Sequence, residues 1–200
     1  MDFHNRLKKE MSEGIVRAIL DDAGYRVIDC GIEKVLREVA CLSADQYKHL
    51  GFPHAFRLLP DMTVMNREQT ETFFIEVKYR SVWSKSLFDE VEEQARIFKQ
   101  LVVVSINGTP PNPRGKDKLP SRHLRCCRAR HTGDKYQVEL KRRDLDGGGS
   151  EWVDVHDLEE DNLWWKMCPL QDVFTQVHDR RHAHTLLSGI DALAGIIQRS

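Results

Sequence analysis

The chain has 200 residues, of which 40% are hydrophobic and 30% charged, and its formal net charge is −1. This composition excludes an intrinsically disordered chain, and the length suits one domain with at most a small appendage. No apolar run approaches the roughly 18 residues that a membrane-spanning helix needs, and residues 1–13 lack the apolar core of a signal peptide. The five cysteines have no paired spacing, so we expect reduced thiols in a cytoplasmic protein without a membrane partner.

The first element is a helix predicted over residues 3–22, because apolar residues recur there at helical spacing. Glu13 borders this apolar stripe instead of facing water, so it is either a surface group at the rim of the buried face or part of a site. A strand at residues 25–32 follows, and then a helix at residues 33–50 that is broken near Ser43. The stripe consists of Leu7, Met11, Ile15, Val16, Ala18, Ile19 and Leu20.

Two adjacent strands are predicted next, over residues 58–65 and 72–79, with a polar turn between them. Side chains alternate along the second strand, so Glu76 and Lys78 share one face of it. Burying a charge without a partner is costly, so an acid and a lysine inside an apolar run need an explanation. Asp61, on the neighbouring strand, supplies another carboxylate close by. Two carboxylates and a lysine that converge on a sheet predict a divalent-cation site.

The pattern then predicts an amphipathic helix over residues 87–100, with Gln94 beside its apolar side. The continuous apolar run at residues 100–106 is typical of a strand that is covered on both faces. Residues 108–120 are rich in Gly and Pro and are expected to form a loop. This order of elements indicates an α/β domain with a mixed central sheet.

A hairpin is predicted from residues 122–130 and 135–141. Residues 112–143 contain eleven Lys or Arg against three Asp or Glu, whereas residues 144–162 contain eight acids and no Lys or Arg. A basic block of this kind favours a nucleic-acid partner bound through its phosphates. The alternatives are a solvated charged face that pairs with the adjacent acids, or acids that contact a partner protein. The candidate phosphate-binding residues are Arg122, Arg125, Arg128, Arg130, Lys141, Arg142 and Arg143.

The last part of the chain is expected to add a strand at residues 151–155 and a helical segment at residues 163–200. Cys126 and Cys127 are adjacent on a predicted strand and point to opposite faces. This arrangement disfavours a zinc site with the neighbouring histidines.

The sequence Pro60-Asp61, fourteen intervening residues and then Glu76-Val77-Lys78 resembles the PD-(D/E)XK pattern of the restriction-endonuclease-like nuclease superfamily. Glu13 on the first helix is similar to the acid that the resolvase and restriction-enzyme branch contributes to its site. The resemblance covers roughly residues 5–106.

This resemblance implies a restriction-endonuclease-like core in residues 1–106, with a mixed central β-sheet flanked by helices. Residues 107–162 would then be a loop, a basic β-hairpin and an acidic segment that extend the sheet. Residues 163–200 would be C-terminal helices, which could supply the interface of the homodimer that symmetric cleavage requires.

The resemblance also implies roles for the site residues. Asp61 and Glu76, with the backbone carbonyl of Val77, would hold Mg²⁺ or Mn²⁺, for which hard oxygen ligands are suited. Glu13 would bind a second cation or orient a water molecule.

Lys78 would stabilise the attacking hydroxide or the pentavalent phosphate, and Gln94 would orient that lysine or the water. The expected function is therefore Mg²⁺-dependent hydrolysis of phosphodiester bonds by a DNA endonuclease. The alternative is a non-catalytic subunit that keeps the fold and binds nucleic acid or protein. The plainest reading of the tripeptide remains a solvated Glu76–Lys78 pair on an edge strand.

Overall fold

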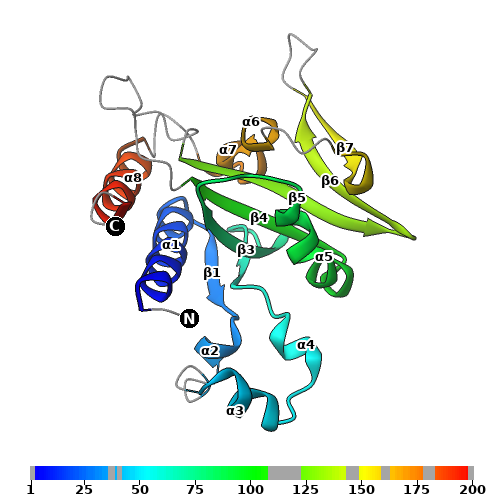
Figure 1. Ribbon diagram of the computed structural model, residues 1–200. Helices are drawn as coiled ribbons and strands as arrows, with labels where there is room; N and C mark the ends of the chain where they lie inside the picture. The colour runs from blue at the N-terminus through cyan, green and yellow to red at the C-terminus, as the bar shows by residue number, and fades with distance from the viewer. Residues whose placement is uncertain are drawn as a thin grey trace.

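The computed structural model describes residues 3–35, 39, 42–107, 123–142, 149–158, 163–177 and 183–197, and Figure 1 shows their arrangement. Within these residues one sheet of eight strands runs through the centre of the molecule. The strands are β1 (Arg26–Asp29), β2 (Met62–Met65), β3 (Thr72–Arg80), β4 (Gln100–Asn107), β5 (Leu124–Thr132), β6 (Lys135–Lys141), β7 (Ser150–Asp154) and β8 (Cys168–Pro169).

The strands are hydrogen-bonded in the order β1-β2-β3-β4-β5-β6-β7, and β8 pairs with the beginning of β5. All of these neighbours are antiparallel except β3 and β4, which run parallel. A parallel pair needs a crossover connection, and helix α5 (Ser86–Phe98) provides it. The described chain is therefore a mixed α/β protein whose open sheet is largely antiparallel.

Each face of the sheet carries its own hydrophobic core, because side chains alternate along the strands. On β3, Phe73, Ile75 and Val77 pack into one core, whereas Phe74 packs against the other. β4 is buried on both faces, as its continuous apolar run predicts. The predicted faces of β3, with Glu76 and Lys78 opposite Val77, are thus confirmed.

Helices cover both faces of the sheet. The first core is covered by α1 (Phe3–Asp22), α7 (Leu170–Val173) and α8 (Ala183–Ile197), and α1 and α8 pack against each other. The second core is covered by α5, α6 (Leu163–Lys166) and the 3₁₀ helix η3 (Val155–Asp157). In Figure 1, α1 (blue) and α8 (red) lie side by side, away from α5 (green).

Helix α1 has the predicted bounds, but its buried side differs from the predicted stripe. Val16, Ile19 and Leu20 are buried in the first core, whereas Leu7 is 37% exposed. Ile15 is only partly buried, and its side chain lies next to Gly189 of α8. The difference arises because the sheet and α8 together set the buried arc, and neither is visible in the periodicity of one helix.

The segment between β1 and β2 consists of short helices in its described part: α2 (Ile32–Val35), α3 (Ala44–His49) and α4 (His54–Arg57). The predicted break near Ser43 is confirmed. Ser43 Oγ accepts a hydrogen bond from the Gln46 N–H at 3.3 Å, and Gln46 Oε1 accepts one from the Ser43 N–H at 2.9 Å. This reciprocal pair is a capping box for α3. Helix α4 was not expected from the sequence.

The remaining elements agree with the predictions only in part. β2 begins at Met62 and not at residue 58, so Asp61 precedes the strand on which it was expected, because Pro60 cannot continue the ladder. The predicted helical segment at residues 163–200 contains the unexpected strand β8 between α6 and α7. β5 and β6 form the expected hairpin, and Gly133 in its turn has a positive φ of 59°. β7 supplies the expected strand, and α8 the C-terminal helix. The expected loop at residues 108–120 lies outside the described residues.

The free thiols are Cys30, Cys126, Cys127 and Cys168, while Cys41 lies outside the described residues. Among the helices that the structure describes, none combines the length and apolarity needed to cross a lipid bilayer.

Candidate active site

The candidate site forms where β2 begins and β3 runs on past it. The register pairs Met62 with Ile75, so Pro60 would lie opposite Val77 if β2 extended further. Proline has no N–H and cannot continue a ladder. The Asp61 carboxylate takes the place of the missing strand, and its Oδ2 accepts a hydrogen bond from the Val77 N–H at 2.8 Å. Because the N–H and C=O of a strand residue point to the same side, the Val77 carbonyl also faces this open edge.

Glu76 is held on both of its carboxylate oxygens. Lys78 Nζ lies 2.9 Å from Oε1, and Gln94 Nε2 on α5 donates to Oε2 at 2.8 Å. The same Gln94 amide lies 3.3 Å from the backbone oxygen of Leu59, next to the start of β2. Gln94 therefore orients the Glu76 carboxylate in this structure, whereas the sequence led us to expect Lys78 or a water molecule as its partner.

Helix α1 brings a further acid and a lysine to the same place. Glu13 is only 8% exposed. Lys9, one turn earlier, places its Nζ 3.7 Å from Glu13 Oε1 and 3.9 Å from Asp61 Oδ1. Lys34 of α2 lies 4.0 Å from Glu13 Oε2. Glu13 thus belongs to the cluster, and Lys9 links it to Asp61.

The electrostatics of the cluster are most evident at Asp61, which is 7% exposed. Burial, followed by the nearby negative charges of Glu76 and Glu13, raises the pKa of this carboxyl to about 8. Lys9 and the hydrogen bond from Val77 act in the opposite direction but are weaker. Burial beside two other carboxylates therefore disfavours the ionised form of Asp61, and a bound cation would stabilise that form.

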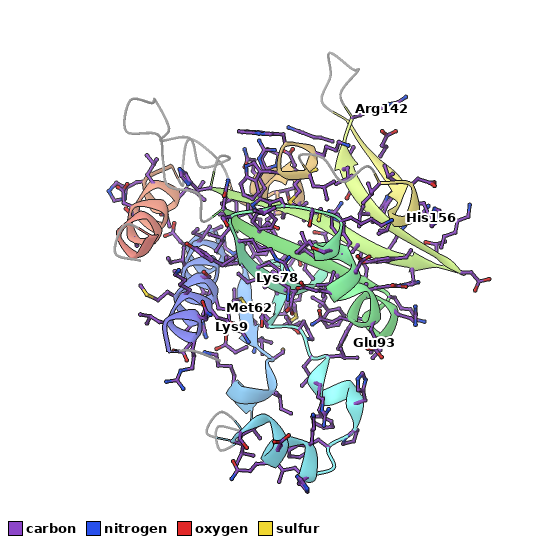
Figure 2. The ribbon with its side chains drawn as sticks, viewed as in Figure 1. Lys9, Met62, Lys78, Glu93, Arg142 and His156 are labelled. Atoms are coloured by element: carbon purple, nitrogen blue, oxygen red, sulfur yellow. The ribbon has the colours of Figure 1, made fainter. Side chains whose placement is uncertain are left out.

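A cavity of about 300 Å³ opens onto Asp61, Glu76, Lys78 and Gln94. Residues 56–59 at the end of α4 form another part of its wall. A second cavity of about 400 Å³ lies between α1 and β3 and shares Lys9, Glu76 and Lys78 with the first. Figure 2 shows Lys9 and Lys78 near the centre of the molecule. Glu13 is not among the residues that line either cavity.

The donor set fits a magnesium ion. In the part of the chain that the structure describes, no three His, Cys, Asp or Glu side chains are grouped to hold a metal ion. What faces the open edge of β3 is a pair of carboxylates, Asp61 and Glu76, together with the backbone of Val77. Mg²⁺ is commonly bound by one or two carboxylates, with water and substrate phosphate oxygens completing its shell. An all-oxygen set of this size suits Mg²⁺ or Mn²⁺ better than zinc.

The basic hairpin is arranged differently from the stripe that its sequence predicts. Arg125 is 7% exposed, and its Nη1 donates to the Met167 carbonyl at 2.6 Å. Its guanidinium also lies 4.8 Å from the centre of the Trp165 ring, and burial lowers its pKa. Arg125 therefore packs against residues of the second core and does not belong to a phosphate-binding surface.

The other candidate phosphate-binding residues that the structure describes have partners nearby. Arg128 lies 2.9 Å from Glu139, and Lys141 lies 3.6 Å from Asp172. Arg142 lies 3.8 Å from Glu151, at the far end of the hairpin in Figure 2. Arg130 stacks over Trp152 at 3.7 Å from the ring centre. Arg122 and Arg143 lie outside the described residues.

Two lysines of the cluster were missed in the sequence. Lys9 had a usable signal, because it lies four residues before Glu13 and therefore on the same face of the helix. Lys34 had none, because only the fold brings this residue of α2 near Glu13 of α1.

Comparisons of the chain with models of protein families, with curated protein sequences and with solved structures found no match.

Proposed function

We propose that this chain is a Mg²⁺-dependent nuclease that hydrolyses phosphodiester bonds, with DNA as its substrate and a restriction-endonuclease-like core. The observation that carries the proposal is the open edge of β3. There a carboxylate replaces a strand, a second carboxylate is fixed by a glutamine, and a lysine follows two residues later. A structural ion pair would not need the cavity that opens onto these groups.

In this proposal Asp61 and Glu76 hold the cation, with the Val77 carbonyl as a third oxygen donor. The bound ion would lower the pKa of a water molecule and neutralise the phosphate. Gln94 keeps the Glu76 carboxylate in one orientation through its amide. Second-layer contacts of this kind commonly change metal affinity or activity by about 10- to 100-fold.

Lys78 has the role of a fixed positive charge beside the phosphate. Its ammonium group lies on the same strand face as Glu76 and lines both cavities. With a cation bound at Glu76, the Lys78 ammonium would be free to stabilise negative charge on the phosphate oxygens. Glu13 positions Lys9, which in turn lies beside Asp61, and the Glu13 carboxylate adds negative charge near the site.

The first experiment is cleavage of supercoiled plasmid in the presence of Mg²⁺ or Mn²⁺. We expect the wild type to nick or linearise the plasmid, and Asp61→Ala and Lys78→Ala each to lose at least about 100-fold of that rate. Glu71→Gln, at an exposed carboxylate just before the same strand, is the matched control and should cleave like the wild type. Metal-dependent cleavage that survives both alanine substitutions would contradict the assignment of Asp61 and Lys78 to the active site.

A second candidate is a non-catalytic subunit that keeps the fold and binds nucleic acid or protein. The observation that favours it is the charge balance of the cluster. Three carboxylates, on Glu13, Asp61 and Glu76, face three ammonium groups, on Lys9, Lys34 and Lys78. Such a cluster can be stable without a metal ion.

Calorimetric titration with Mn²⁺ separates the two candidates. The nuclease proposal requires a binding isotherm that Asp61→Asn and Glu76→Gln abolish, with or without DNA. A wild type that produces no heat of binding in either condition would favour the subunit.

A further inference from the structure

The inward face of α1 changes character halfway along the helix. Its second half carries the buried apolar residues Val16, Ile19 and Leu20. Counting back along the same face at helical spacing leads to polar residues instead. These residues are Asn5, Lys8, Lys9 and Ser12, and all four line the cavity between α1 and β3.

The opposite wall of this cavity is the run of residues 76–79 on β3. It contains the carboxylate and the lysine of the candidate active site, followed by Tyr79. The cavity, of about 400 Å³, therefore adjoins the place where phosphodiester chemistry is proposed, and it shares Glu76 and Lys78 with the cavity there. Any polymer that reaches the site along α1 must pass these residues.

Ser12 contributes a buried hydroxyl to the wall of this cavity. The residue is 1% exposed, and its Oγ has no hydrogen-bond partner among the described residues. A buried hydroxyl without a partner is costly, and helix serines commonly bond to the preceding turn instead. Because Ser12 lines the cavity, a rotation of its side chain would let the hydroxyl donate to a phosphate oxygen there.

Lys8 provides a positive charge at the wall of this cavity. Its Nζ lies 5.7 Å from the centre of the Tyr79 ring, and it forms no salt bridge with any described residue. The hairpin cations Arg128, Lys141 and Arg142, in contrast, all lie beside carboxylates. Lys8 is thus more readily available to a phosphate than these three cations of the hairpin.

We propose that the cleft between the first half of α1 and residues 76–79 is the subsite that holds the nucleic-acid backbone next to the cleaved phosphodiester. Lys8 provides a charge for a flanking phosphate, Ser12 and Asn5 donate hydrogen bonds, and the Tyr79 ring supports the lysine. This inference rests on the proposed function for the identity of the ligand. It places the principal contact with nucleic acid on α1 instead of on the hairpin.

The test is the binding of fluorescein-labelled DNA, duplex and single-stranded, and of the equivalent RNA, measured by fluorescence anisotropy in EDTA across a series of KCl concentrations. EDTA removes catalysis from the measurement. We expect Lys8→Ala to weaken binding about five- to tenfold and to reduce the slope of log affinity against log salt by about 0.7 to 0.9, which is the contribution of one phosphate contact. Ser12→Val should weaken binding about two- to tenfold, as for one lost hydrogen bond.

Lys141→Ala on the hairpin is the matched control and should bind like the wild type, and circular dichroism melting should show each variant folded. Normal binding by folded Lys8→Ala together with weakened binding by Lys141→Ala would overturn the inference in favour of the hairpin. A wild type that cleaves plasmid but binds no nucleic acid in EDTA would also overturn it, while the proposed function would stand. Binding that depends on Lys8 in a protein that cleaves nothing would support the subsite and reject the nuclease.

Discussion

At the scale of single residues, Asp61 shows how one side chain can serve both the fold and a site. Its carboxylate closes the edge of β3 by accepting the Val77 N–H, and it is buried beside Glu76 and Glu13. The hydrogen bond stabilises the ionised form, but burial and the neighbouring acids disfavour it more strongly. Because these effects act on the ionised carboxylate in the folded state, the free energy of unfolding should depend on pH.

Without metal, we expect the free energy of unfolding of the wild type to fall as the pH rises from about 4, the usual Asp value, through about 8. The sign follows because the folded state binds the Asp61 proton more tightly than the unfolded state over this window. Protonated Asp61 therefore makes its full contribution to stability below the pKa that this carboxyl has in the unfolded chain. The contribution is lost as the pH rises through the pKa that Asp61 has in the folded protein. Urea unfolding in EDTA at several pH values measures this decline.

Asp61→Asn removes the titrating group while keeping an oxygen that can accept from Val77, so its stability should decline less with pH. Added Mn²⁺ should flatten the wild-type curve, because the ion binds the ionised carboxylate, and should leave the variant unaffected. Parallel curves for the two proteins in EDTA would show that Asp61 does not titrate as the structure implies.

The residues of the site were predictable from the sequence to different degrees. Asp61, Glu76 and Lys78 stood out because charge inside apolar strands is a local anomaly. Lys34 and the partner of Gln94 depend on how distant segments cross, which no local pattern records. The burial of Arg125 had no local signal either, because its hydrogen-bond partner Met167 lies 42 residues further along the chain.

At the scale of elements, the placement of α1 decides whether Glu13, Lys9 and Lys8 reach the sheet. α1 packs on β3 and on α8. The contact with α8 is close at Gly189, where an added Cβ would lie 3.1 Å from Ile15 Cγ2. Gly14 on α1 lies in open space, because a Cβ there would meet no atom within 4 Å.

This contrast predicts opposite effects of two substitutions at helical glycines. Gly14→Ala should raise the free energy of unfolding by up to about 1 kcal/mol, because alanine favours the helix and meets no neighbour. Gly189→Leu should lower it by about 1–3 kcal/mol, because the side chain forces α8 away from Ile15 and Ile19. Urea denaturation of the two variants measures both, and a stabilised Gly189→Leu would show that the helices are not packed as described.

The strands were more predictable than the connections between them. Alternation and continuous apolar runs arise from burial of the strand itself, so β3, β4 and the β5–β6 hairpin could be predicted from local pattern. The short helices between β1 and β2 could not, because helices of four to six residues are too short to show a period and are held by their surroundings.

At the scale of the whole molecule, the C-terminal segment completes the core that the first hundred residues begin. Phe174 is fully buried, with its ring centre 5.7 Å from that of Tyr25 and 5.2 Å from that of Phe73. The Gln176 N–H also donates to the Tyr25 hydroxyl at 3.2 Å. The segment thus packs against Tyr25, just before β1, and against β3, and a boundary after residue 106 would cut through one core.

Phe174→Ala should therefore destabilise the whole molecule and not merely its C-terminal part. The loss of a buried aromatic ring typically costs about 3–5 kcal/mol, because the cavity that remains collapses only partly. Unfolding in urea, followed by far-ultraviolet circular dichroism and by tryptophan fluorescence, should remain a single transition at a lower midpoint for both signals. Phe56→Ala, at a ring that is 41% exposed on α4, should change the midpoint little. If the two signals separated in Phe174→Ala, with most of the sheet surviving, the segment would be an appendage and residues 1–106 would be a folding unit of their own.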